Sequence, residues 1–361
     1  MGNTMTKFLV TLAAAWMGSV GVTAAMPQNA SKERRLKVPA GVQVNPPFCF
    51  SPDGSLVAAL SQKGRRKNVE WRIIVWETKR GKVKQQLKGL REQIRWMAFA
   101  DDGSSLVSIS SKDGRGYVWD PKSGRRKKVV PLTAQDSRRY SALSPNGKWL
   151  ATSFEIDMES GRTEVAELSS GALLWDDETH ARSIMFASQA NVLIVHRMLK
   201  KKVGKPNAKG EQRMSIQFSL VAKSATTGKT LWEVKRASLR GTTALAAIPS
   251  SDEFLFVNST GVERRSVVTG ELLSKVSLTT NPATDRRSFR GAMLSNDGRQ
   301  LALHSSESRL EIWDLEASAK AGKPIGKSKA WGYGFALSPD LNLAVSQSRK
   351  RWVLVEWQDL K

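Results

Sequence analysis

Cysteine is almost absent from this chain of 361 residues, in which Cys49 is the only one. No intrachain disulfide can form, and no metal site built from several cysteines can exist. Histidine is nearly as scarce, because the chain holds only His180, His196 and His304, too scattered along the sequence to suggest a metal site. We therefore predict neither a metal nor a cofactor.

Long helical periodicity is missing after the first 25 residues, and so are the short motifs of several enzyme classes. No nucleophile elbow, Walker loop or dinucleotide fingerprint occurs in the strand–loop–helix context that would support it. The sequence therefore contains no motif of a serine hydrolase, a nucleoside triphosphatase or a nicotinamide-dependent enzyme.

Long apolar runs are also few, and residues 8–22 form the main one. Lys7 precedes this run, and the small residues Thr23, Ala24 and Ala25 follow it, which is typical of a secretory signal peptide. The run is shorter than the roughly 20 residues that a membrane-spanning helix needs. We predict that residues 1–25 are a signal peptide and that the protein is exported, with no other transmembrane segment. Retention of the leader as an anchor is the alternative.

Positive charge is what the chain has in excess. It carries 57 Lys and Arg against 33 Asp and Glu, for a formal net charge of +24. Such a balance favours anionic partners, namely nucleic acid, anionic glycans or an acidic membrane surface. Export argues against nucleic acid as the physiological partner. A basic, solvated surface with no specific partner is the alternative.

A module of short strands and turns recurs along the chain, most clearly at residues 94–120. Its predicted strands are Ile94–Phe99, Leu106–Ser110 and 116–119, joined by turns that contain Asp-Gly pairs. The ends of the first strands recur near positions 50, 99, 143, 186, 248, 294 and 337. A Trp-Asp or Trp-Glu pair follows in the best copies, and a Gly turn comes about five residues later. A period of about 40–45 residues with four strands each is typical of propeller blades.

The Ser-Pro-Asp-Gly turns and Trp-Asp pairs resemble the WD40-repeat family over about residues 45–361. None of the three histidines follows a glycine, so the Gly-His element of that family is missing. We predict an all-β, seven-bladed propeller of four-stranded antiparallel blades over residues 36–361, after a disordered lead-in at 26–35. The last repeat runs out after three strands. We expect residues 36–44 to close the ring by pairing with Arg351–Glu356, as propellers of this family do.

Two further segments invite a functional interpretation. Residues 198–213, between the second and third strands of the fourth repeat, are basic and rich in Gly and Pro. We interpret them as a flexible solvated loop, with an electrostatic arm for an anionic partner as the alternative. The turns that lead to Trp175 and Trp232 resemble those of quinoprotein-type propellers, which dock this Trp between blades. We interpret these turns as structural.

The candidate site lies at the start of the first strands. The residue four places before the strand end is arginine in four repeats, and strand side chains alternate with period two. In WD40 proteins the residues four and six places before this end surround the mouth of the central channel. The resemblance therefore implies a basic channel mouth, formed by Arg95, Arg139, Arg182, Arg290, Tyr333, His180 and Trp331. Arginine suits bidentate recognition of carboxylate, sulfate or phosphate. Ordinary charged loop ends, with a one-residue slip at Arg138, are the alternative.

These observations favour a non-catalytic, monomeric binding or scaffold module for a protein or an anionic polymer such as a glycan. The alternative is a propeller enzyme, either quinoprotein-like or a lactonase-like hydrolase, because propellers host both binding and catalysis. The inferred mouth residues include no carboxylate, which argues against acid–base catalysis there.

Overall fold

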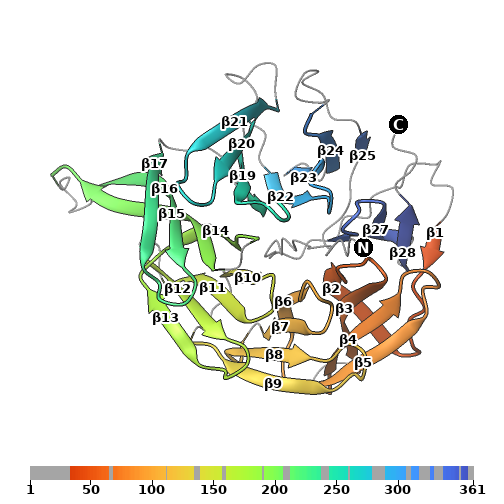
Figure 1. Ribbon diagram of the computed structural model, residues 1–361. Helices are drawn as coiled ribbons and strands as arrows, with labels where there is room; N and C mark the ends of the chain where they lie inside the picture. Colours follow the sequence, from red (N-terminus) through yellow and green to blue (C-terminus); the bar gives the residue numbers. More distant parts are fainter. Residues whose placement is uncertain are drawn as a thin grey trace, which may run out of the picture.

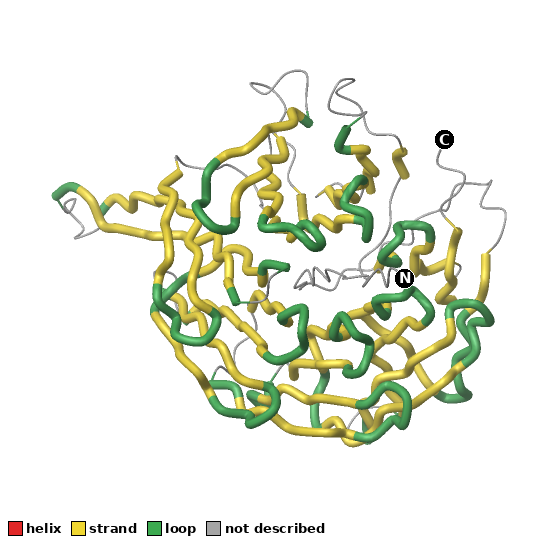
Figure 2. Tube along the Cα trace, in the orientation of Figure 1, coloured by secondary structure: helices red, strands yellow, loops and turns green. Residues whose placement is uncertain are grey.

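Seven four-stranded sheets stand around a central axis as the blades of a propeller in the computed structural model (Figure 1). The structure describes residues 33–64, 68–110, 112–133, 139–156, 160–188, 191–205, 212–236, 244–258, 261–278, 289–305, 310–316, 326–328, 336–348 and 351–356. The predicted signal peptide lies outside these ranges. The described residues form strands, turns and loops without a helix (Figure 2). The predicted all-β, seven-bladed fold is confirmed.

Blades 1 to 4 each use four consecutive strands. These are β2 (Val42–Phe50), β3 (Leu56–Lys63), β4 (Glu70–Glu77) and β5 (Val83–Leu90); β6 (Ile94–Phe99), β7 (Leu106–Ser110), β8 (Arg115–Trp119) and β9 (Arg126–Pro131); β10 (Arg139–Leu143), β11 (Trp149–Glu155), β12 (Gly161–Glu167) and β13 (Leu173–Asp177); and β14 (Ala181–Phe186), β15 (Val192–Val203), β16 (Arg213–Ser224) and β17 (Thr230–Arg236).

Blades 5 and 6 follow the same plan, and blade 7 completes its sheet with the first strand of the chain. These strands are β18 (Ala244–Ala247), β19 (Glu253–Asn258), β20 (Gly261–Ser266) and β21 (Leu272–Ser277); β22 (Phe289–Leu294), β23 (Gln300–Ser305), β24 (Leu310–Asp314) and β25 (Gly326–Ser328); and β26 (Ala336–Leu337), β27 (Leu343–Ser348), β28 (Arg351–Glu356) and β1 (Glu33–Arg35). The first strand of each blade lies next to the axis (Figure 1).

The ring is closed by an N-terminal strand, as predicted, but by an earlier one. β1 pairs with β28 in the register Glu33↔Val355 to Arg35↔Val353. The expectation that residues 36–44 are this strand is wrong, and so is that of a disordered lead-in for residues 33–35. The reason is the turn that follows β1, where Pro39 lacks an N–H donor and Gly41 has a φ of 71°. The residues after this turn form β2, the first strand of blade 1.

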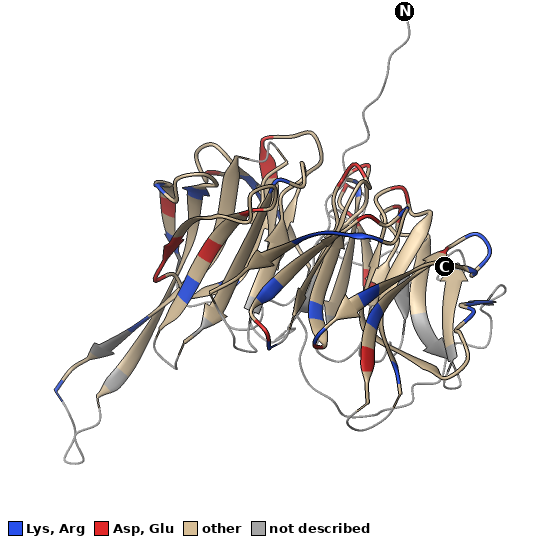
Figure 3. Ribbon diagram, turned by 90° about the horizontal axis from the view of Figure 1, so that it is seen from below, with Lys and Arg blue, Asp and Glu red and all other residues tan. Residues whose placement is uncertain are grey.

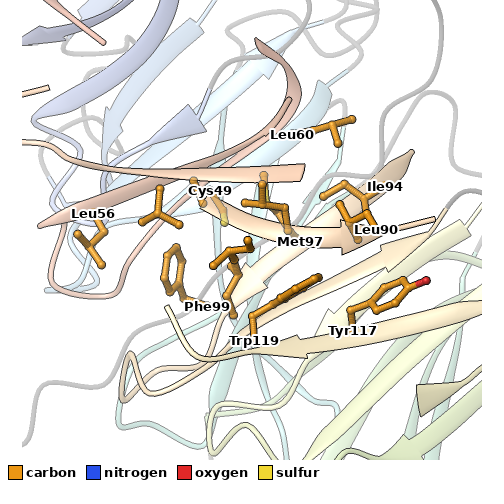
Figure 4. Close-up of a cluster of buried hydrophobic side chains, with 14 residues drawn as sticks. Cys49, Leu56, Leu60, Leu90, Ile94, Met97, Phe99, Tyr117 and Trp119 are labelled. Carbon is orange, nitrogen blue, oxygen red and sulfur yellow. The ribbon is translucent and has the colours of Figure 1, made fainter. Parts of the chain in front are cut away.

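The hydrophobic core is divided into seven clusters, each between two neighbouring blades. The cluster between blades 1 and 2 contains Trp119, Tyr117, Phe99 and Cys49 (Figure 4). Burial raises the pKa of the Cys49 thiol far above its ordinary value. Because no single blade encloses a core of its own, each blade is stable only when both neighbours cover it.

Residues 198–203 and 213 belong to strands and not to the flexible loop that their composition indicates, whereas residues 206–211 lie outside the described residues. β15 and β16 pair without interruption from Val192↔Ser224 to Val203↔Arg213, which makes a long two-stranded ribbon. Cross-strand backbone pairing continues because the chain does not turn before Gly204, which has a φ of 80°. The ribbon projects beyond the body of the propeller (Figures 1 and 3).

Candidate functional site

The two ends of the central channel have different structures. Since neighbouring strands are antiparallel, the first strand starts on the same face on which the second and third strands are joined. We call this the loop face. The opposite face, which we call the turn face, carries the turns after the first and third strands.

Turns after the first strands are built by serine and aspartate. Ser51 Oγ donates to Asp53 Oδ1 at 2.6 Å and accepts the backbone N–H of Leu56 at 2.9 Å. The same bonds recur around Ser295 and Ser338, and turns of neighbouring blades also meet, since Asn296 N donates to Pro339 O at 3.0 Å. These Asp side chains therefore fix the shape of each turn, which explains the recurring Ser-Pro-Asp-Gly sequence.

The carboxyl groups of these turns have lowered pKa values for a structural reason. Burial acts to raise the pKa of Asp53, but hydrogen bonds from Ser51 and Ser55 outweigh it and hold the pKa below its ordinary value. In Asp297 the bond from Ser295 is the largest effect and lowers the pKa. The hydrogen bonds of these turns thus favour the charged form of the aspartates.

The four predicted arginines all lie at the starts of first strands, on the loop face. Arg139 is the first residue of β10, whereas Arg95, Arg182 and Arg290 are the second residues of β6, β14 and β22. First strands of neighbouring blades contact one another, for example β2 with β6, β10 with β14 and β18 with β22. The backbones of these residues therefore lie beside the loop-face end of the channel.

Three of the arginines share a feature that sequence reasoning missed. The strand register shifts between Ile94 and Trp96, between Ala181 and Ser183, and between Phe289 and Gly291. Arg95, Arg182 and Arg290 each lie at such a shift, the extra residue of a β-bulge. Bulges re-aim side chains and are common beside functional sites. They also interrupt the period-two alternation on which the predicted ring was based.

The fourth arginine does not share this geometry. Arg139 pairs directly with Phe154, and Tyr140 pairs with Ser153, so the start of β10 has no bulge. Arg139 lies four residues before the strand end at Leu143, but it pairs in the place that Ile94 takes in blade 2, which is the one-residue slip considered above. Because it lacks the bulge, Arg139 belongs to the candidate site only by its place at the start of a first strand.

Side chains are described for only part of the predicted site. Arg95 and Arg182 are half-buried, and His180, directly before β14, is buried. The backbone carbonyl of His180 accepts the N–H of Met198 at 2.9 Å, which fixes the base of the ribbon to the start of β14. The side chains of Arg139 and Arg290, and the whole of Trp331 and Tyr333, lie outside the described residues. Convergence of the four guanidinium groups therefore stays a prediction.

Many other arginines of the propeller are bound to carboxylates. Arg72 pairs with Glu70, Arg162 with Asp176, and Arg197 Nη2 with Glu233 Oε1 at 2.6 Å. Arg182 differs, because it makes no ion pair with another described residue.

The tryptophan turns dock between blades, as their resemblance implied. Trp175 Nε1 donates to Ala225 O at 2.8 Å, and Trp232 Nε1 donates to Val267 O at 2.7 Å. The ring of Trp175 covers Gly228, where an added Cβ would lie 2.7 Å from the ring. Both tryptophans therefore hold neighbouring blades together.

The described ranges offer neither a metal-binding cluster nor a membrane-spanning helix. No group of three or more His, Cys, Asp or Glu residues lies close enough within these ranges to hold a metal ion. Nor does any described helix have the length and apolar character to cross a membrane.

Comparison with known proteins identifies the fold but no family. No protein-family model and no curated sequence matches the chain. Among solved structures, the β-propeller domain of Myceliophteria thermophila Cps50 (Swd1) is similar, with a TM-score of 0.62 and 16% identity over 90% of this chain and 99% of that chain. Kuenenia stuttgartiensis hydrazine synthase is similar with a TM-score of 0.60 and 13% identity, over 87% and 95% of the two chains. At these identities the likeness concerns the fold alone, which serves both binding and catalysis.

Proposed function

We propose that this protein is a non-catalytic binding module that holds an anionic group of a polymer or protein partner at the loop-face end of its channel. The observation that carries this proposal is the repeated bulge in β6, β14 and β22, with arginine at the same place in each. A single arginine at a strand start is ordinary. The same residue at the same irregularity of three inner strands is best explained by a shared task.

The chemistry of arginine defines the ligand class. A guanidinium offers a rigid fork of N–H donors that matches carboxylate, sulfate or phosphate. Several such groups around one channel end repel one another, by about 1–4 kcal/mol for each close pair at surface-like dielectric. A bound anion removes that repulsion, and the excess of 24 positive charges assists its approach.

Binding to heparin, a sulfated polymer, and to polyglutamate, a carboxylate polymer, tests the proposal. We expect both affinities to fall as salt rises. Arg95→Ala combined with Arg182→Ala should weaken binding by at least about tenfold, because hydrogen bonds to charged groups contribute about 1.5–3 kcal/mol each. The matched control is Lys79→Ala combined with Arg80→Ala, which removes two exposed cations from the turn face. Equal losses in both double variants would show that only net charge matters and would overturn the site.

Export is a separate proposal, supported by Lys7 and the apolar residues 8–22. Mass spectrometry of the protein from its native host should find a mature chain that begins near Met26. An intact N-terminus in the exported protein would instead support retention as an anchor.

A further inference from the structure

The outermost strand of blade 5 has an open edge. The sheet of this blade runs in the order β18, β19, β20, β21, and β21 pairs with β20 from Leu272↔Arg265 to Ser277↔Gly261. On its other side β21 pairs with no strand within the described residues, and that side faces away from the axis of the ring (Figure 1). The backbone N–H and C=O groups along such an edge are a template for one more strand.

The outer strands of blades 1 and 2 carry the residues that ordinarily protect such an edge. In blades 1, 2 and 5 the register between the third and fourth strands shifts at the same point, which leaves one extra residue in the outer strand. This residue is an exposed lysine in two blades, Lys84 in β5 and Lys127 in β9, but it is Leu273 in β21. β9 also ends in Pro131. Exposed charge and proline disfavour the addition of a strand, and β21 has neither at these places.

Leu273 belongs to a group of exposed aliphatic side chains at the outside of blades 4 and 5. We call this group the apolar rim, and it consists of Leu231 (51% exposed), Val268 (67%), Leu272 (50%) and Leu273 (49%). Leu231 has in β17 the place that Leu273 has in β21. The two blades meet here, because Trp232 Nε1, next to Leu231, donates to the carbonyl of Val267, next to Val268, at 2.7 Å. A group of exposed aliphatic side chains is typical of a surface that a partner covers.

The only charged residue of β21 is Lys275. It is exposed and makes no ion pair with another described residue. Its cross-strand neighbour Glu263 is buried, and that carboxylate accepts Arg265 Nε at 2.8 Å. Directly opposed side chains of neighbouring strands interact. A strand that pairs with the open edge is therefore favoured by a carboxylate opposite Lys275 and by apolar side chains opposite the two leucines.

Possible occupants of this edge differ in what they require. Two copies of this chain each carry a formal net charge of +24, and such charge opposes self-association. Residues 1–32 of the chain contain no Asp or Glu and offer no carboxylate for Lys275. A glycan has no ladder of backbone donors and acceptors and gains nothing from exposed leucines. An extended, partly acidic segment of another protein suits the open edge, the apolar rim and Lys275 together.

We propose that β21 binds an extended segment of a partner protein as a fifth strand of blade 5, with apolar side chains of that segment on the apolar rim and a carboxylate at Lys275. In strand addition the main-chain hydrogen bonds give affinity, and the alternate side chains give specificity. The proposal does not depend on the arginines of the channel mouth. Those arginines lie on first strands next to the axis, whereas β21 is the strand of blade 5 farthest from it (Figure 1).

A peptide-binding experiment with the full chain tests strand addition. The probe is the fluorescein-labelled peptide Thr-Glu-Thr-Glu-Val-Ile-Val-Thr, and fluorescence anisotropy measures its affinity. Two further peptides carry N-methyl groups on either the odd or the even amides. Only alternate N–H groups of a strand face one neighbour, so one methylated peptide should lose at least about tenfold in affinity and the other much less. Equal losses in both peptides, or no binding of the unmodified peptide at millimolar concentration, would overturn the proposal.

Leu273→Lys gives β21 the residue type that blades 1 and 2 have at the same place. It should weaken binding of the unmodified peptide by about fivefold, because the peptide covers a half-exposed leucine. The control Val129→Lys adds the same charge at a position 36% exposed on the outer strand of blade 2 and should leave the affinity unchanged. Thermal unfolding checks that both variants fold. Equal affinities of the two variants would contradict the proposal, and self-association that Leu273→Lys abolishes, without peptide binding, would assign the edge to a second copy.

An exchange of charge tests the carboxylate at Lys275. Lys275→Glu should weaken the glutamate peptide and strengthen the peptide Thr-Lys-Thr-Lys-Val-Ile-Val-Thr, each by about threefold, because opposed charges on neighbouring strands attract. Lys88→Glu, at an exposed position of the outer strand of blade 1, changes the net charge equally and should shift both affinities much less. Equal shifts in the two variants would show that only net charge matters and would overturn the pairing at Lys275.

Discussion

Blades 2 and 5 fill the same place in the third strand with opposite chemistry. Blade 2 uses Trp119, which is fully buried and whose Nε1 donates to Ser108 Oγ at 3.0 Å. Blade 5 uses Arg265, which is only 7% exposed, with Nε donating to Glu263 Oε2 at 2.8 Å and Nη1 to Gly270 O at 2.7 Å. Tryptophan and the arginine–glutamate pair are therefore two solutions for this place, each with donors bonded to nearby atoms, whereas blade 3 has the small Ala166 there.

Blades 4 and 6 are intermediate between these solutions. Lys223 of blade 4 reaches Asp177 of blade 3 at 2.5 Å and lies 5.8 Å above the ring of Trp175. Trp313 of blade 6 keeps the indole but donates to the buried Glu311 at 3.1 Å. In blades 4, 5 and 6 a carboxylate thus takes part at this place, whereas in blade 1 Trp76 Nε1 donates to Lys37 O at 2.8 Å.

Removal of the indole in blade 2 should have the largest effect of the changes considered. Trp119→Ala leaves a cavity between blades 1 and 2 and should lower the free energy of unfolding by about 3–5 kcal/mol. Trp119→Phe keeps most of the volume and loses the bond to Ser108, so it should cost clearly less. Denaturant unfolding measures both, and equal costs would show that the hydrogen bond, not the volume, is what blade 2 requires.

Breaking the ion pair of blade 5 should cost nearly as much. Glu263→Gln leaves the buried guanidinium of Arg265 without its counter-charge, which typically costs about 3–5 kcal/mol. Replacement of the pair as a whole, Glu263→Leu with Arg265→Met, should recover most of that loss, because apolar side chains of similar volume often replace buried pairs without cost. A double variant as unstable as the single one would mean that the place in blade 5 specifically requires charge.

The sequence predicted blades 2 and 4 unequally well, for physical reasons. Trp119-Asp120 repeats a pattern that can be read locally, whereas Lys223 is explained by Asp177, which is distant in sequence and belongs to another blade. The ends of the first strands could be predicted because Ser-x-Asp turns bond within themselves, as Ser51 does with Asp53.

The candidate site and the ribbon show what local patterns omit. A bulge at Arg182 depends on the register between β14 and β15, which no single strand encodes. The lysine run at residues 200–202 has the composition of a loop, and only its pairing with residues 214–216 makes it a strand. Position along the chain could be predicted for the arginines, but the direction of their side chains could not.

The glycine turns of blades 5 and 2 also differ in the side chains that lie beside them. Gly270 of blade 5 has a φ of 75°, and an added Cβ would lie 2.7 Å from the ring of Trp232. Gly124 of blade 2 has a φ of 77°, but the Cβ would meet only the end of the flexible Gln85 side chain at 3.0 Å. Both Gly→Ala changes carry the same backbone penalty, so the difference isolates the docked indole. Gly270→Ala should be more destabilising by about 1–3 kcal/mol.

Thermal unfolding of the two alanine variants measures that difference. In the Trp232→Leu background the two Gly→Ala costs should become similar, because the rigid ring is gone. A Gly270→Ala variant as stable as Gly124→Ala in the unchanged protein would show that the ring moves aside freely.

The smallest expected effect is a dependence of stability on acid pH. It should distinguish blade 2 from blade 5, because different residues follow Trp119 and Arg265. Asp120 Oδ1 accepts the backbone N–H groups of Lys122 and Ser123, at 2.8 and 3.2 Å. In blade 5 Ser266 Oγ accepts two such N–H groups, from Val268 and Thr269, at 3.1 and 3.2 Å. The turns have the same form, but only blade 2 holds it with a group that titrates.

Hydrogen bonds to the Asp120 carboxylate, from Ser123 first and then from the backbone of Lys122, lower its pKa. A group with a lowered folded pKa stabilises the protein above its unfolded pKa, about 3.9 for Asp. That stabilisation is lost as pH falls through the folded value. Unfolding of unchanged protein and Asp120→Ser should therefore differ most above about pH 5 and converge below pH 4. Ser266→Asp should give blade 5 the same acid-dependent contribution, and a Ser266→Asp variant whose difference from the unchanged protein is independent of pH would break the equivalence of the two turns.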